Sequence, residues 1–267
     1  MEKKYKIINF YYEDLLSKFF HGIDINNNNK VIIQKINKNN IEIEYVINEI
    51  QFLSELNSPY ILKLLDNFEE HDFYYFIFEN FDMTLKEYIK IEKNISVVDI
   101  KKILIQLNNA IKTMHDKWIC HRDINPLNIV IIFNDEDNNN NTNKNKKRDF
   151  SIKLNNFIIA KCWSESDTMS TIIGSPDYMA PEVYTKQYKS TCDLYSIGVL
   201  ICDLYYTENE EEKKNILFNN RNGENFELPK DDELIKDLIK KTIQIDPKKR
   251  ISWDEYFKHA FFNSYKL

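Results

Sequence analysis

The chain has 267 residues, 43% of them hydrophobic, so it is long enough to bury a core in one large domain or in two lobes. Its net charge of -6 and pI near 5.5 argue against general electrostatic binding to nucleic acid or to an anionic membrane. The four cysteines form no CxxC pair, which argues against a disulfide framework and against a zinc site.

The beginning of the chain leads into no apolar run of the signal-peptide type. The apolar stretch at residues 197–204 is too short to span a bilayer. We therefore expect an intracellular protein, cytoplasmic or nuclear, that binds neither a membrane nor nucleic acid. These features leave its oligomeric state open.

The first eighty residues are expected to form strands and one helix. Runs of β-branched and aromatic residues predict strands at 5–10 and 30–36. Apolar residues then recur at helical spacing through 46–56, which predicts a helix with one buried side. Two further strands are expected at about 61–68 and 73–78. This part of the chain predicts a small, strand-rich lobe.

Helix is expected to dominate from residue 84 onward. Apolar positions between 100 and 114 form a stripe at helical spacing, and Ser96 is a suitable N-cap for that helix. A second stripe occupies 234–243. These patterns predict a larger, mainly helical lobe after the strand-rich one.

A polar segment at about 134–149 interrupts two short apolar strands, 129–133 and 152–154. It is rich in Asn, Asp and Lys, and it has too little apolar surface to offset the entropy of ordering it. We predict a disordered insertion in a hairpin.

Residues 121–128 read His-Arg-Asp-Ile-Asn-Pro-Leu-Asn, and 180–182 read Ala-Pro-Glu. Both motifs resemble those of eukaryotic protein kinases, and so do Asp193-Leu-Tyr-Ser-Ile-Gly and Arg250 further along. The resemblance covers about 5–262. It implies an α+β, two-lobed protein-kinase fold: a small antiparallel-sheet N-lobe with one helix, about 5–80, and a larger, mainly helical C-lobe, about 81–262.

The resemblance implies structural roles for several matching residues. Glu182 and Arg250 would form a buried ion pair that holds the activation segment against the helical lobe. Asp193 would accept backbone hydrogen bonds from the catalytic loop. His121 and Phe157 would belong to a stack of side chains that connects the lobes, together with Leu53 and Leu64.

Thr171 stands where many members of the family are phosphorylated. Arg122 would be placed to pair with a phosphate at that position. A plain exposed threonine is the alternative.

The catalytic positions are only partly retained. Asp123 matches the residue that accepts the substrate hydroxyl proton, and Asn128 matches the second metal ligand. Asn125 replaces a lysine that contacts the transferred phosphate, and Asn156 replaces the aspartate of Asp-Phe-Gly that holds magnesium. Asp123 and Asn128 also have an alternative role, in which their hydrogen bonds only shape the loop.

The third strand departs from the pattern at its phosphate-binding residue. Gln34 replaces the lysine that grips the α and β phosphates, so Glu49 would lack its cationic partner. Lys35 is adjacent, but side chains alternate along a strand, so it should point away unless the register slips. The nucleotide-contacting positions implied by the resemblance are Ile32, Gln34, Glu49, Glu79, Phe81 and Val130.

The chain has four scattered glycines and therefore no glycine-rich phosphate loop. An ungapped match to the family places Tyr12, Asp14 and Ser17 where three glycines belong. Glycine is needed there for close backbone approach to phosphates. Asp14 would instead bring a negative charge toward ATP.

Phosphate and metal positions are lost while packing motifs remain. The sequence therefore predicts a pseudokinase that acts as a scaffold or as an allosteric partner of other proteins, such as an active kinase or a substrate. ATP and magnesium would be cofactors only if residual binding persists. The alternative is a divergent, weakly active Ser/Thr kinase that uses Lys35 or another cation.

Overall fold

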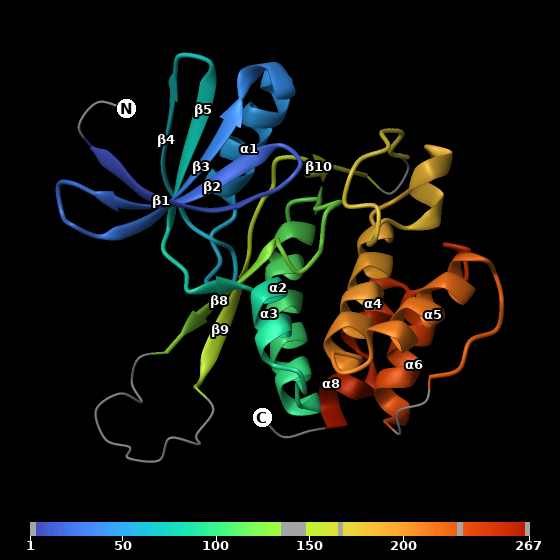
Figure 1. Ribbon diagram of the computed structural model, residues 1–267. Coiled ribbons are helices and arrows are strands. Elements are labelled where there is room, and N and C mark those ends of the chain that lie inside the picture. Colours follow the sequence, from blue (N-terminus) through green and yellow to red (C-terminus); the bar gives the residue numbers. More distant parts are fainter. Residues whose placement is uncertain (1–3, 135–147, 165–167, 229–231, 265–267) are drawn as a thin grey trace, which may run out of the picture.

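The computed structural model describes residues 4–134, 148–164, 168–228 and 232–264. Figure 1 shows two lobes, a smaller one built mainly of strands and a larger one built mainly of helices. The predicted α+β arrangement, with an antiparallel sheet in the N-lobe and a helical C-lobe, is confirmed.

A five-stranded antiparallel sheet forms the N-lobe, in the order β1-β2-β3-β5-β4. Because side chains alternate along a strand, β3 contributes to two different clusters. Ile32 and Ile36 pack on the inner side, in a cluster that includes Val130 of the C-lobe, whereas Val31 and Ile33 pack on the outer side. The strands are β1 (Tyr5–Glu13), β2 (Ser17–Asp24), β3 (Lys30–Asn37), β4 (Leu64–Glu70) and β5 (Phe73–Glu79).

The one α-helix in the described part of the N-lobe, α1 (Ile43–Glu55), follows a short 3-10 turn, η1 (Lys38–Asn40). Val46 packs into the inner N-lobe cluster, while Phe52 packs into the main cluster of the C-lobe. Helix α1 therefore buries side chains against both lobes.

The predicted strand at 61–68 was placed too early. Strand β4 begins at Leu64, and Ile61 instead forms an isolated parallel bridge with Leu154 of the C-lobe. A residue that resembles the start of a strand thus belongs to the connection between the lobes.

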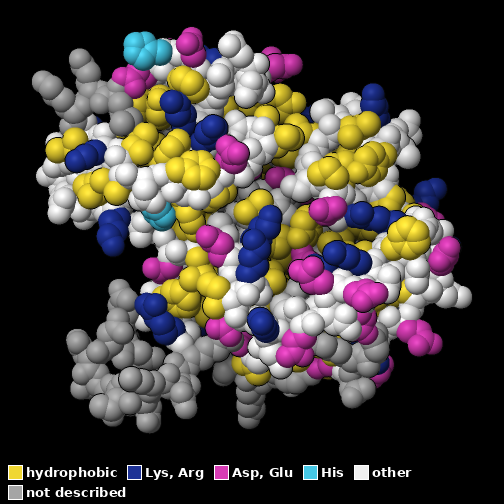
Figure 2. Space-filling model, viewed as in Figure 1, with side chains coloured by type: hydrophobic (Ala, Val, Ile, Leu, Met, Phe, Trp, Pro, Cys, Tyr) yellow, Lys and Arg dark blue, Asp and Glu magenta, His cyan; other side chains and the backbone are white. Residues whose placement is uncertain are grey.

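The two lobes differ on the face shown in Figure 2. Hydrophobic side chains gather over the strands of the N-lobe, while acidic and basic side chains are interspersed over the helices of the C-lobe. Ile8 and Phe10 of β1 are each about half exposed. Charged side chains are visible on both lobes in this view.

The C-lobe is organised around α4, all of whose residues are buried. Gly198 of α4 lies against α6, where an added Cβ would come within 2.4 Å of Thr242 Oγ1. None of the described helices is both long and apolar enough to cross a membrane. The helices are α2 (Leu85–Ile91), α3 (Val97–His115), α4 (Cys192–Tyr205), α5 (Glu210–Arg221), α6 (Glu233–Thr242), α7 (Trp253–Phe257) and α8 (Ala260–Ser264), with the 3-10 helix η3 (Pro181–Thr185).

Short strands line the junction of the lobes. Two small sheets are described, β6-β8-β9 and β10-β7. Helix α3 begins after Ser96, whose side chain accepts a hydrogen bond from Asp99 N as the predicted N-cap. The predicted insertion at 134–149 lies largely outside the described residues. The strands are β6 (Met83–Thr84), β7 (Ile119–Cys120), β8 (Ile129–Phe133), β9 (Phe150–Leu154) and β10 (Lys161–Cys162).

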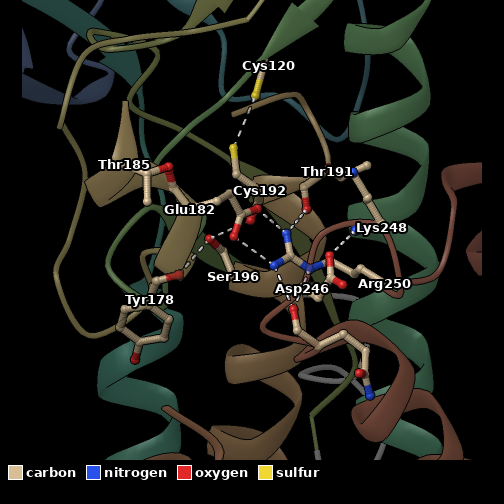
Figure 3. Close-up of polar contacts among 11 residues, drawn as sticks. Cys120, Tyr178, Glu182, Thr185, Thr191, Cys192, Ser196, Asp246, Lys248 and Arg250 are labelled. Carbon is tan, nitrogen blue, oxygen red and sulfur yellow. Dashed lines mark hydrogen bonds and ion pairs between the residues drawn. The ribbon is translucent and has the colours of Figure 1, made fainter. Parts of the chain in front are cut away.

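An ion pair between Glu182 and Arg250 is buried inside the C-lobe (Figure 3). The two guanidinium nitrogens lie 2.5 Å and 2.9 Å from the two carboxylate oxygens, and the Arg250 side chain is fully buried. Arg250 also donates to the carbonyls of Thr191 and Gln244. Such a bidentate pair, with its remaining donors used, fixes η3 against the loop that precedes α7.

We expect the substitution Arg250→Met to lower the free energy of unfolding by about 3–5 kcal/mol, because it leaves Glu182 charged, buried and unpaired. The double variant Glu182→Leu with Arg250→Met should lose less than the sum of the two single variants. Urea unfolding followed by circular dichroism measures both quantities.

Lys258→Ala is the matched control, because Lys258 and Asp254 form an ion pair in which both side chains are largely exposed. Its cost should stay below about 1 kcal/mol. An Arg250→Met variant that is no less stable than this control would contradict the structural role of the buried pair.

Candidate functional site

The loop at 121–128 follows β7 and is anchored by a buried carboxylate of α4. Asp193 Oδ2 accepts from His121 N at 2.8 Å, and Asp193 Oδ1 accepts from Arg122 N at 2.9 Å. Arg122 has a φ of 67°, a conformation that costs energy for a residue of its type. The two bonds to Asp193 hold the loop in this shape.

His121, the first residue of this loop, packs against the segment that carries Phe157. The two rings lie 5.0 Å apart in an edge-to-face arrangement, and His121 Nε2 lies 3.0 Å from the carbonyl oxygen of Asn155. Burial lowers the pKa of His121, so the ring is neutral at pH 7. Leu53 and Leu64 pack on the adjoining hydrophobic clusters. The residues of the expected stack thus lie at the junction between the lobes.

Asp123 is held by hydrogen bonds on both carboxylate oxygens. Oδ1 accepts from Ser175 N at 2.9 Å, and Oδ2 accepts from Asn128 Nδ2 at 2.6 Å. Asn125 donates to Ser175 Oγ at 3.1 Å. The contacts to Ser175 tie the loop at 121–128 to the segment around that residue. Asn125 makes its contact with a neutral amide, where the family has a cation.

Asn156 presents an amide nitrogen where a metal would need an oxygen. Its Nδ2 donates to Asn128 Oδ1 at 3.1 Å and lies 3.4 Å from Asp14 Oδ2, so acceptors on both sides require the NH₂ group there. Asn156 Oδ1 is buried without a partner among the described residues. Asn156 has a φ of 65°, a conformation that asparagine tolerates better than most residues.

Gln34 is turned toward its own lobe. Its Nε2 donates to Ser17 Oγ at 2.8 Å, and the side chain is almost fully buried. Glu49 Oε1 accepts from Phe157 N at 3.1 Å, while Oε2 has no hydrogen-bond partner among the described residues. Burial raises the pKa of the Glu49 carboxyl to about 8, so it is mainly protonated at pH 7.

Lys35 does not reach this site. Its Nζ lies 3.7 Å from the centre of the Phe73 ring and 5.6 Å from that of Tyr75, on the outer side of the sheet. Strands β2 and β3 pair without a register shift through this region. The alternation of side chains along β3 therefore directs Lys35 away from Glu49.

The apolar positions expected to contact a base are packed together. Ile32 and Val130 are fully buried, Phe81 is 2% exposed, and all three share one cluster with Phe19 and Ile158. Ile158 stands where the family motif has glycine, so a branched side chain fills space that the family leaves open.

The Glu79 side chain takes part in an ion pair and a hydrogen bond with the backbone. Its Oε1 lies 2.6 Å from Lys153 Nζ and accepts from Lys63 N at 2.8 Å. Its side chain thus connects β5 to β9, across the junction between the lobes.

Among the described contacts, a tyrosine links the Thr171 backbone to Arg122. Tyr188 Oη donates to the Thr171 carbonyl oxygen at 2.7 Å and accepts from Arg122 Nη1 at 3.4 Å. Arg122 Nε donates to Ile159 O at 2.7 Å. The Thr171 side chain is exposed, and no described contact joins it to Arg122.

Two features of the cleft were not anticipated. Asp14 Oδ1 accepts from Leu16 N and Ser17 N, which folds the β1-β2 hairpin into a side-chain-capped turn. Tyr11 Oη donates to Glu87 Oε2 at 2.5 Å, from β1 to α2 of the other lobe. The Asp-x-x-Ser spacing could have signalled the turn, but no local pattern connects Tyr11 with Glu87.

Two cysteines far apart in the sequence meet beside Asp193. Cys120 Sγ lies 3.9 Å from Cys192 Sγ and 3.3 Å from Asp193 Oδ2 (the cysteine pair is visible in Figure 3). Both Asp193 oxygens already accept backbone hydrogen bonds, and burial raises the pKa of the Cys120 thiol well above its ordinary value. Packing therefore accounts for the close approach of the two cysteines and Asp193.

The residues of the cleft do not fit a magnesium–nucleotide complex. Asn128 Oδ1 is occupied by Asn156, Gln34 is bonded to Ser17, and no described lysine or arginine pairs with Glu49. A hard divalent cation prefers charged oxygen, and the nitrogen of Asn156 faces the place where that oxygen would be.

Comparison with known proteins connects this geometry to one family. The protein kinase domain family model matches residues 16–262. A putative serine/threonine-protein kinase of Acanthamoeba polyphaga mimivirus is 35% identical over 92% of the chain. Serine/threonine-protein kinase ULK3 of Xenopus laevis is 29% identical over 86%, and atg1 of Dictyostelium discoideum is 28% identical over 92%. The chain spans 60%, 48% and 37% of the lengths of these relatives.

We expect the substitution Glu49→Gln to raise stability at neutral pH. The folded-state pKa of Glu49, about 8, lies above its ordinary value of 4.5, so the unfolded chain releases this proton first as the pH rises. Glu49 thus makes the free energy of unfolding fall between pH 4.5 and 8. The variant lacks this loss and should be about 3 kcal/mol more stable at pH 7, with little difference near pH 4.5.

Chemical unfolding at a series of pH values measures the effect. Glu55→Gln, on the exposed side of the same helix, is the matched control and should follow the wild-type profile. Parallel pH profiles for Glu49→Gln and the wild type would show that Glu49 is not the buried acid described here.

Proposed function

Because the chain belongs to the protein kinase domain family, we propose that it is a member without efficient phosphoryl transfer, a pseudokinase that acts through binding other proteins. The single observation that carries this proposal is the state of Glu49. In active members of the family this carboxylate pairs with a lysine. Here it is buried and without a described cationic partner, next to a strand whose matching residue is the neutral Gln34.

The pattern of losses supports a binding role. Asn125, Asn156 and Gln34 each put a neutral amide in place of a charged group that would handle phosphate or metal. The loss of one preorganised electrostatic stabiliser costs about 3 kcal/mol in a transition state. Even two of these three losses, allowing for partial additivity, lower the rate by roughly three to four orders of magnitude.

The packing motifs remain in place. Glu182 and Arg250 are paired, and Asp193 holds the catalytic loop. A C-lobe held together by these contacts can present a folded surface to a protein partner, even where turnover is lost. We propose an intracellular scaffold or allosteric partner, with an active kinase or a substrate of one as the partner.

A weakly active Ser/Thr kinase is the second candidate. Asp123 and Asn128 are retained, and Asn128 Nδ2 lies 2.6 Å from Asp123 Oδ2. The relatives named above carry serine/threonine kinase names. That candidate needs a cation in the cleft, and Lys35 lies on the opposite side of the sheet.

A phosphotransfer assay separates the two candidates. Wild-type protein is incubated with labelled ATP, magnesium or manganese, and a generic basic protein substrate. We expect label transfer no faster than with the Asp123→Ala variant, because the charges that stabilise the transferring phosphate are missing.

Asp123→Ala is the informative control, since contaminating kinases would label the substrate equally in both samples. Transfer by the wild type that disappears in Asp123→Ala would establish the active-kinase candidate and end the pseudokinase proposal.

A further inference from the structure

The tip of the β1-β2 hairpin reaches across the cleft to the C-lobe. Asp14 Oδ1 accepts from Leu16 N at 2.9 Å and Ser17 N at 2.7 Å, so the hairpin itself orients the carboxylate. The other oxygen, Oδ2, lies 3.4 Å from Asn156 Nδ2. Asp14 thus faces the position where the family holds magnesium.

Asp14 is the centre of a continuous polar chain. On the N-lobe side Ser17 connects it to Gln34, and on the C-lobe side Asn156 connects it to Asn128. Asn128 in turn donates to Asp123 Oδ2. Positions that bind phosphate and metal in other members of the family are here joined to one another by hydrogen bonds.

The changes at positions 14 and 156 are complementary. An aspartate at 156 would place a second carboxylate within about 4 Å of Asp14, a strongly repulsive arrangement. Asparagine instead supplies a donor to Asp14. Burial raises the pKa of Asp14, and the nearby Asp123 carboxylate adds to the rise, so this part of the cleft is already unfavourable for negative charge.

The aromatic residues before Asp14 cover the apolar end of the cleft. The Tyr11 ring lies 5.9 Å from that of Phe81, and its hydroxyl donates to Glu87 of α2. The Tyr12 ring stacks on that of Phe19 at 4.4 Å with an interplanar angle of 12°. Both tyrosines pack against the cluster that contains Ile32 and Val130.

The hairpin places aromatic rings at the apolar end of the cleft and a carboxylate at the polar end. A nucleotide has the same arrangement, with an aromatic base at one end and anionic phosphates at the other. We propose that the β1-β2 hairpin is an internal ligand of this cleft, and that Asp14 is the residue that determines its specificity by excluding the phosphate groups of nucleotides. This inference deepens the proposed function and rests on it, since an enzyme using ATP could not keep Asp14 in this place.

The test compares ligands that differ only in phosphate. ATP, ADP and adenosine are titrated by isothermal calorimetry against wild type, Asp14→Asn and Asp14→Ser, each with magnesium and with EDTA. Two variants are used so that one misfolded protein does not decide the result, and circular dichroism verifies that each is folded. Glu13→Gln is the matched control, because Glu13 is an exposed acid in the same hairpin, directly before Asp14, and faces Lys18.

We expect at least tenfold tighter binding of ATP and ADP to both Asp14 variants than to wild type, equal with magnesium and with EDTA. Adenosine should bind the variants as it binds the wild type, since Asp14 acts on phosphate alone. Glu13→Gln should match the wild type with all three ligands.

Three results would overturn the inference: no gain for ATP in either folded Asp14 variant, an equal gain for adenosine, or an equal gain in Glu13→Gln. Phosphate transfer is measured on the same samples to keep the two proposals apart. Wild type that binds ATP as tightly as Asp14→Asn without transferring phosphate defeats the internal ligand alone, whereas transfer dependent on Asp123 defeats the proposed function.

Discussion

The hydrogen bonds that Asp193 accepts from the catalytic loop are the interaction on which the rest of the site depends. They hold Arg122 in a left-handed conformation and so place His121 against Phe157. Arg122 then reaches the carbonyl of Ile159. One buried carboxylate at the first turn of a fully buried helix therefore fixes both segments that line the C-lobe side of the cleft. None of these contacts requires a nucleotide.

In the cleft, the loss of a charged residue is accompanied by a change in the charge or identity of the residue that faces it. The strand lysine is replaced by Gln34, and the facing Glu49 is buried with a pKa that keeps it mainly neutral at pH 7. The metal-binding aspartate is replaced by Asn156, and its amide faces Asp14. An unpaired buried charge is costly, so losing one partner favours neutralising the other. The two sets of changes yield a cleft whose polar residues bond to one another, while Gln34 Oε1, Glu49 Oε2 and Asn156 Oδ1 stay without a hydrogen-bond partner among the described residues.

Sequence motifs predicted the contacts that short patterns encode. The family resemblance implied the Glu182 and Arg250 pair, the residue type and position of Ser96 predicted the helix cap, and the alternation of β3 placed Lys35 outside. The contact of Tyr11 with Glu87 spans 76 positions and was missed. Such contacts depend on how the lobes pack, which propensity and periodicity do not contain.

An active kinase has to open and close its cleft in every catalytic cycle. A ligand that is part of the chain needs no such cycle, because the chain itself sets its effective concentration at the site. As the proposed internal ligand, the β1-β2 hairpin, joined to the C-lobe through Asp14 and Tyr11, would keep the spacing of the lobes independent of nucleotide concentration. A protein partner of the proposed kind would then meet the same surface with and without nucleotide.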